Sequence, residues 1–184
     1  MKDKIRQMVR EGLEDKITKI SIFDFDGTLM ATPEPDGIDS ETGKPISNVY
    51  KEKTGEDWPF KGWWGRNEGL DMEIFDINPI PSVIADYNEE VARPNTRVVM
   101  MTGRIPKNAE HVEKILKAHS LKFDEYIYKK KSDTLGFKIG KLEEMLANYP
   151  NLREIEMWED RVEHTKAFRE WGADKNNEMI VNQV

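Results

Sequence analysis

Short apolar segments of strand type alternate with amphipathic helical segments along most of this chain, and this alternation restricts the possible folds more than any other feature. Strand-type segments are predicted at 17–25, 96–101, 124–128, 155–158 and 179–181. Helical spacing of apolar residues predicts helices at 3–16, 81–92, 107–118, 134–148 and 162–171, with Gly172 just past the last one. Strands and helices in this order form right-handed crossovers and a parallel sheet covered on both faces. The sequence therefore predicts an α/β fold.

Segment 32–80 interrupts the alternation. It is rich in proline, glycine and acidic residues and shows no sustained helix or strand period. Because 184 residues exceed a typical domain of about 150 residues only slightly, we predict one domain over 1–184 with a small cap inserted at 32–80 after the first core strand.

Four aromatic residues gather in this insertion: Trp58, Phe60, Trp63 and Trp64. One interpretation is that a small insertion needs aromatic bulk to build a core of its own. The other is that the insertion stacks on a base or closes over a binding site. Both hold if a single ring faces the site, and we assign Trp64 to that role.

The amino-acid composition limits the kinds of chemistry that this protein can carry out. The 28 basic and 35 acidic side chains give a net charge of −7, which argues against a protein that coats nucleic acid by bulk electrostatics. The absence of cysteine excludes disulfides, thiolate nucleophiles and cysteine-ligated metals. No apolar run approaches the ~18 residues of a membrane span, and the N-terminal segment is charged throughout. We therefore expect a soluble, cytoplasmic protein with no membrane partner, whose chemistry rests on carboxylates, hydroxyls, amines and oxygen-binding metals.

Three of the predicted strands end in polar clusters: Asp24-Phe25-Asp26-Gly27-Thr28, Thr102-Gly103-Arg104 and Glu159-Asp160-Arg161. In an open parallel sheet, the ligand crevice lies outside the carboxyl ends of the strands, so these three clusters are expected to meet at one site.

The residue types in these clusters suit phosphoryl transfer. One carboxylate can attack phosphorus to form an acyl phosphate, and a second carboxyl can protonate the leaving oxygen and then activate water. Clustered carboxylates repel one another unless a cation is near, and Mg²⁺ suits an all-oxygen site. Lys138 is the candidate for a nearby ammonium, with Lys141 one turn further on as the alternative.

The motifs resemble those of the haloacid dehalogenase (HAD) superfamily. Residues 23–29 are similar to its first motif, 101–104 to its second, Lys138 to its third and Glu159-Asp160 to its acidic fourth. Thr32-Pro33, Trp63-Trp64, Thr134-x-x-Phe137-Lys138 and the segment Glu159-Asp160-Arg161-x-x-His164 further resemble the HAD domain of the Swiss army knife RNA-repair proteins. The Asp-Arg pair before a helix is also similar to the phosphatase half of phage-type polynucleotide kinases.

The resemblance implies a HAD-like, Rossmann-like sheet and a role for each matched residue. Asp24 would be the nucleophile and a metal ligand, and Asp26 the general acid and base, its backbone carbonyl also binding the metal. Thr102 would hold the transferring phosphoryl group and Lys138 would be its counter-charge. Asp160 would bind the metal, while Glu159 is either its supporting partner or the ligand itself.

These residues lead us to expect a Mg²⁺-dependent phosphohydrolase that forms an aspartyl-phosphate. Its expected partner is a phosphorylated nucleotide or nucleic acid end, bound by Gly103, by the Arg104 fork, by Lys130 of the basic run 129–131, and by Trp64. A phosphatase of a small metabolite phosphomonoester and a catalytically silent binding module of the same fold are the alternatives. The sequence leaves the oligomeric state open. His164, one turn after Asp160, is expected to support the acidic loop rather than to bind a metal.

Overall fold

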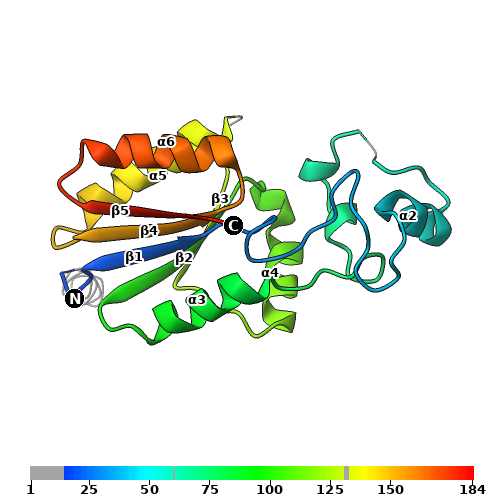
Figure 1. Cartoon of the computed structure of the whole chain (residues 1–184), viewed down its shortest axis with the longest axis horizontal. Helices are drawn as coiled ribbons and strands as arrows, with labels where there is room; N and C mark the ends of the chain where they lie inside the picture. Colours follow the sequence, from blue (N-terminus) through cyan, green and yellow to red (C-terminus); the bar gives the residue numbers. More distant parts are fainter. Residues whose placement is uncertain (1–14, 60, 131–132) are drawn as a thin grey trace, which may run out of the picture.

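A single five-stranded parallel sheet forms the centre of the molecule (Figure 1). The structure is a computed structural model that describes residues 15–59, 61–130 and 133–184. The strands run in the order β3-β2-β1-β4-β5. Their bounds are β1 (Lys19–Phe23), β2 (Thr96–Thr102), β3 (Glu125–Tyr128), β4 (Glu154–Glu159) and β5 (Glu178–Gln183). The predicted α/β fold is confirmed, and every strand lies within two residues of its predicted bounds.

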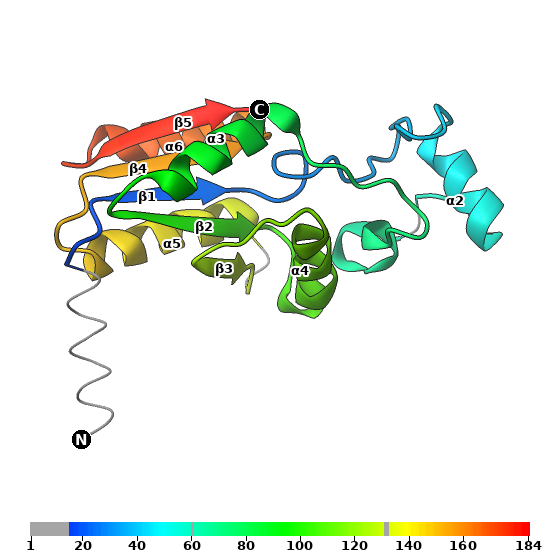
Figure 2. The same cartoon turned by 90° about the horizontal axis from the view of Figure 1, so that it is seen from below.

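Helices cover both faces of this sheet (Figures 1 and 2). One face carries α3 (Pro81–Ala92) and α4 (Ala109–Ala118), and the other carries α5 (Thr134–Asn148) and α6 (Val162–Ala173). Along β1, Phe23 packs in the first layer, whereas Ile20 and Ile22 pack in the second. Alternate side chains of one strand therefore enter two separate cores, as expected for a parallel sheet that is covered on both faces.

Two helices differ from their predicted bounds by two residues: α4 begins later and α6 ends later. A 3-10 helix at Pro106–Asn108 precedes α4, so the α-helix begins at Ala109 rather than at Lys107. The helix predicted at 3–16 lies almost wholly outside the described residues. Within the described ranges, no helix combines the length and the apolar composition that crossing a membrane requires.

The insertion contains a helix that the sequence did not predict, α2 (Ile46–Thr54). It buries Ile46, Val49 and Tyr50, which are spaced three and four residues apart as on one face of a helix. Only nine residues carry this period, and Gly55 ends it in the left-handed conformation (φ 78°). The period was too short to stand out among the surrounding prolines.

Aromatic rings pack together in the insertion. The Trp58 ring lies 5.4 Å from that of Tyr50, 5.1 Å from that of Trp63 and 5.2 Å from that of Phe75. Phe60, which was grouped with these rings on sequence, lies outside the described residues.

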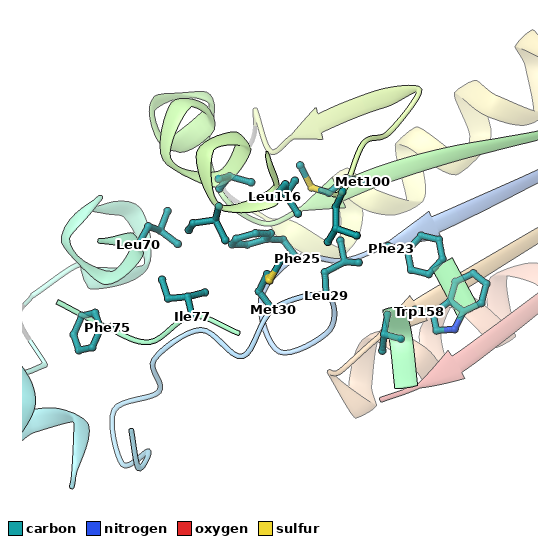
Figure 3. Packing of buried hydrophobic residues seen from close by; sticks show 14 of the residues in the cluster. Phe23, Phe25, Leu29, Met30, Leu70, Phe75, Ile77, Met100, Leu116 and Trp158 are labelled. Atoms are coloured by element: carbon teal, nitrogen blue, oxygen red, sulfur yellow. The ribbon is translucent and has the colours of Figure 1, made fainter. Parts of the chain in front are cut away.

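This aromatic group is continuous with the core on one face of the sheet and does not form a core of its own. Figure 3 shows Phe25, Leu29 and Met30 between Leu70 of the insertion and Met100 of β2. All are fully or almost fully buried. The turn that follows β1 therefore joins the insertion, which projects beyond the carboxyl ends of the strands (Figures 1 and 2), to the sheet.

Gly172 lies inside α6 and not after it, contrary to the prediction. A Cβ atom at this position would lie 2.4 Å from Cβ of Met179 on β5, closer than packed atoms approach. Glycine is therefore required here because α6 packs tightly against β5, not because the helix ends.

We predict that Gly172→Ala lowers the free energy of unfolding by roughly 1–3 kcal/mol, the usual cost of overpacking. Helix propensity alone predicts the opposite sign, since alanine is favoured over glycine by about 1 kcal/mol. Urea denaturation measures the difference.

The matched control is Gly140→Ala in α5, where an added Cβ has no atom within 4 Å. It should raise the free energy of unfolding by about 0.5–1 kcal/mol. An equal stabilisation by both substitutions would contradict the packing account.

Candidate active site

The three polar clusters meet at the carboxyl ends of β1, β2 and β4. Asp24 directly follows β1, Thr102 is the last residue of β2, and Glu159 and Asp160 end and follow β4. The Asp24 amide donates to the Trp158 carbonyl (3.1 Å), so the pairing of β1 with β4 continues into the site. Adjacent strands thus bring residues 24 and 159 side by side although 135 positions separate them.

The turn after β1 depends on Gly27. Its φ of 66° is one that side chains rarely tolerate, and a Cβ there would lie 2.7 Å from Oδ2 of Asp160. The Leu29 amide closes the turn by donating to the Asp24 carbonyl (3.2 Å). Glycine therefore allows both the sharp turn and the close approach of the Asp160 carboxylate.

Lys138 is fully buried beneath these carboxylates. Its Nζ lies 2.7 Å from Oδ2 of Asp24 and 2.7 Å from Oε2 of Glu159. α5, which carries Lys138, begins at an Asp133 cap whose carboxylate accepts from the Gly136 amide (2.8 Å). Lys141, the alternative on sequence, instead pairs with Glu144.

Burial and mutual repulsion change the ionisation of the acids. Burial raises the pKa of Asp24 to about 8, assisted by the charges of Glu159 and Asp26 and opposed by Lys138. Burial also acts to raise the pKa of Glu159, but contacts with His164 and Lys138 outweigh it and lower that pKa to about 2. Burial, together with the charge of Glu159, raises the pKa of Asp160 to about 6. The raised pKa values of Asp24 and Asp160 mean that ionising all of these acids is unfavourable unless a further positive charge is present.

Three carboxylates could hold a metal ion. Asp24, Glu159 and Asp160 each offer an oxygen, and these oxygens lie within 4.8 Å of one another. An all-oxygen set of this kind fits a hard divalent cation. Glu159 is fully buried, with Lys138 on Oε2 and His164 Nδ1 3.3 Å from Oε1, whereas Asp160 lines the open cavity. Both oxygens of Glu159 thus face groups of the protein, whereas the Asp160 carboxylate can be reached from the cavity.

A cavity of about 420 Å³ opens above these acids. Its lining carries four acidic and three basic side chains together with a few other groups: Asp24, Asp26, Glu34, Asp160, Arg104, Lys129, Arg161, Trp64, Gly103, Thr134 and His164. With a divalent cation bound, the balance of charge would favour an anionic ligand.

Of the expected substrate-binding residues, Gly103, Arg104 and Trp64 line this cavity, whereas Lys130 does not. The neighbouring Lys129 lies there instead, and its Nζ donates to Thr134 Oγ1 (3.0 Å). Because successive residues near a strand end point to opposite sides, the basic run alone could not indicate which lysine faces the site.

Arg104 lies at the cavity, but its guanidinium already has partners within the protein. Nη2 lies 2.7 Å from Oδ1 of Asp26, Nε lies 3.0 Å from Oδ2, and Nη1 donates to the Trp64 carbonyl (2.8 Å). The guanidinium nitrogens that the sequence analysis expected to bind a phosphate instead contact the Asp26 carboxylate.

Thr102 is fully buried, and its Oγ1 accepts from the Arg104 amide (3.0 Å). Arg161 belongs to a cluster that the sequence predicts at this site and Thr134 to a quoted motif, but sequence reasoning gave neither of them a role there. Glu34 was missed altogether, because it lies in the irregular insertion and no local pattern marks it.

Comparison with known proteins identifies a family. The model of "HAD domain family 1 in Swiss Army Knife RNA repair proteins" matches residues 81–184, a range that contains Thr102, Lys138 and Asp160 but begins after Asp24. A Saccharomyces cerevisiae protein described as "Uncharacterized protein YMR265C" is 27% identical over 176 residues. The alignment covers 85% of this chain and 37% of the yeast protein, so this chain spans little more than a third of that relative's length.

Among solved structures, the HAD domain of the effector protein Lem4 from Legionella pneumophila is similar, with a TM-score of 0.49 and 12% sequence identity. The match covers 91% of this chain and 86% of that domain's chain.

We predict that Lys138→Met lowers the free energy of unfolding, measured in urea with chelator present, by about 3–5 kcal/mol. The substitution leaves two buried carboxylates without their counter-charge, which is the costly way to break a buried ion pair.

Lys141→Met is the matched control on the same helix. Its partly exposed pair with Glu144 should contribute less than about 1 kcal/mol. A loss at Lys138 as small as the loss at Lys141 would show that the buried ammonium does not stabilise the site.

Proposed function

Because this chain belongs to HAD domain family 1 in Swiss Army Knife RNA repair proteins, a family whose fold indicates a phosphatase-type hydrolase, we propose that it is a Mg²⁺-dependent phosphomonoesterase. Asp24 would be the nucleophile. The observation that carries the proposal is the buried Lys138 between Asp24 and Glu159, with Asp160 beside them at the floor of an open cavity.

The Asp24 carboxylate is held by two fixed donors. Oδ1 accepts from the Phe25 amide (2.8 Å), and Oδ2 faces Lys138 (2.7 Å). These contacts orient the carboxylate before substrate binds, which removes part of the entropic cost of the attack. A carboxylate oxygen would form a bond to phosphorus while the bond from phosphorus to the leaving oxygen breaks.

Asp26 would move the proton. In the first step it would donate a proton to the leaving oxygen, which departs as an alcohol. In the second step, it would take a proton from the water that attacks the aspartyl-phosphate, and inorganic phosphate and the Asp24 carboxylate would be released. Over both steps, one monoester and one water give one alcohol and one phosphate.

Asp24 and Asp160, with the Asp26 backbone carbonyl that the resemblance implies, would hold Mg²⁺. When bound, the ion supplies positive charge that offsets the charge of the phosphoryl oxygens and of the acids around them. Lys138 and Glu159 would keep the ligands in place from below.

The proposed substrate is a terminal phosphate of a nucleic acid or a nucleotide. Arg161 and Lys129 line the cavity and supply positive charge for a phosphate or a neighbouring phosphodiester. The name of the family refers to RNA repair, which supports the same class. Segment 32–80 would act as a cap over the site, because Trp64 belongs to both the insertion and the cavity lining.

A phosphatase of small metabolites is the second candidate. The cavity of about 420 Å³ favours it, since this volume lies near the lower end of the range for small-molecule sites. The presence of both Asp24 and Asp26 argues against a silent binding module.

A panel of phosphorylated substrates tests the proposal. We expect purified protein with Mg²⁺ to release phosphate from 3′- or 5′-phosphorylated oligonucleotides at least as fast as from mononucleotides and sugar phosphates. A preference for sugar phosphates by more than tenfold, about 1.4 kcal/mol in transition-state binding, would favour the metabolite candidate.

Asp24→Asn should lower kcat by on the order of 10³-fold or more, because the chemical step of such enzymes is accelerated by at least about 10⁶-fold. Asp174→Asn, on an exposed residue after α6, is the control and should leave the rate unchanged. Full activity of a folded Asp24→Asn protein would refute the assignment of the nucleophile.

Removal of divalent cations should abolish phosphate release, and Mg²⁺ should restore it. Mg²⁺ at about 100 times its Kd should also stabilise the wild-type fold by about 2.7 kcal/mol. We expect Asp160→Asn to lose most of this stabilisation in thermal unfolding and Asp174→Asn to keep it. Phosphate release that is indifferent to chelator would exclude a metal requirement.

A further inference from the structure

Arg104 connects three parts of the molecule that are distant in sequence. Its guanidinium contacts both oxygens of Asp26, which lies 78 positions earlier, and the carbonyl of Trp64 in the insertion. Its Cζ also lies 5.0 Å from the centre of the Trp64 ring. Each of the three guanidinium nitrogens therefore has a partner within the protein.

The Arg104 side chain is 2% exposed, so its position is fixed on every side. The backbone is fixed as well, because the Arg104 amide donates to Thr102 Oγ1 (3.0 Å) and the Arg104 carbonyl accepts from the Lys129 amide (2.8 Å). A buried planar guanidinium of this kind imposes one orientation on the carboxylate that it contacts.

The two oxygens of Asp26 are held unequally. Oδ1 accepts from Nη2 of Arg104 (2.7 Å) and from Oγ1 of Thr32 (2.9 Å). Among the described residues, Oδ2 has only the Nε contact, which Nε shares with Oδ1. Oδ2 is thus the oxygen that remains available to exchange a proton with a substrate.

We propose that Arg104 is a positioning residue that acts through Asp26, holding Oδ1 together with Thr32 so that Oδ2 faces the reacting centre. Because Arg104 also contacts the Trp64 carbonyl, the orientation of the Asp26 carboxylate depends on how the insertion packs against the sheet. The proposal rests on the proposed function and deepens it, since it assigns Arg104 to proton transfer rather than to phosphate binding.

The choice of leaving group distinguishes these two roles. A general acid matters greatly when the leaving group is a basic alkoxide and little when it is a weakly basic aryl oxide. A residue that binds the phosphate matters equally for both, because the phosphoryl group is the same. We therefore compare kcat/KM for glycerol phosphate and for p-nitrophenyl phosphate, because this constant reports the first chemical step.

For Arg104→Met, kcat/KM on glycerol phosphate should fall by on the order of 10²-fold or more, while the value on p-nitrophenyl phosphate falls by less than about threefold. The inhibition constant of inorganic phosphate should change by less than about threefold. Arg104→Lys keeps the positive charge but loses the planar guanidinium that contacts both oxygens of Asp26, so it should fail to restore the rate on glycerol phosphate. Arg153→Met, on an exposed residue before β4, is the matched control and should behave as wild type.

Two further variants test the route through Asp26. If Arg104 acts through this acid, adding Arg104→Met to Asp26→Asn should cost no more than Asp26→Asn alone on glycerol phosphate. Thr32→Val removes the other donor to Oδ1 with little change of shape, and it should show the same leaving-group dependence with a smaller amplitude. Thr32→Val also tests the proposal if Arg104→Met does not fold.

Equal losses on both substrates, a weakened inhibition by phosphate, or an additive double variant would overturn this inference and assign Arg104 to phosphate binding. In each of these cases the wild-type protein remains a phosphatase and the proposed function stands. A wild-type protein inactive on every monoester would instead overturn the proposed function, and this inference with it.

Discussion

The buried ammonium of Lys138 is the interaction on which the rest of the site depends. Parallel pairing of β1 with β4 places Asp24 beside Glu159 in the interior, where two carboxylates repel strongly. Lys138 from α5 lies 2.7 Å from each of them and makes that pairing tolerable. One positive charge does not offset a third acid, Asp160, and the excess of negative charge is what makes this end of the sheet suited to a divalent cation.

The insertion is joined to this centre through packing and through charge. Phe25 and Met30, in the turn that carries Asp26, lie in the apolar cluster that also contains the aromatic residues of segment 32–80. Arg104 adds a polar connection between Asp26 and Trp64. Movement of the insertion would therefore change the setting of Asp26 more directly than that of Asp24, which is held from below by α5 and β4.

Strand and helix periods predicted the sheet and its covering helices well, because alternate burial leaves a strong pattern in sequence. The same reasoning failed at α2, whose nine residues are too few to reveal a period. It also failed at Gly172, because a glycine required by tight packing was interpreted as the residue that ends a helix. The rule that ligand crevices lie at the carboxyl ends of parallel strands predicted that the three polar clusters meet, and residues of all three line one cavity. It could not predict that the Arg104 fork contacts Asp26, because no local pattern links residues 78 positions apart, and it could not choose between Lys129 and Lys130.

Phosphopeptide mapping of protein quenched in acid during turnover would detect the aspartyl-phosphate itself. With Mg²⁺ and a phosphorylated oligonucleotide, we expect one phosphoryl group on the peptide that contains Asp24, and none in the Asp24→Asn protein treated in the same way. A phosphoryl group on another residue, or rapid turnover with no covalent intermediate under conditions that preserve acyl phosphates, would contradict this expectation.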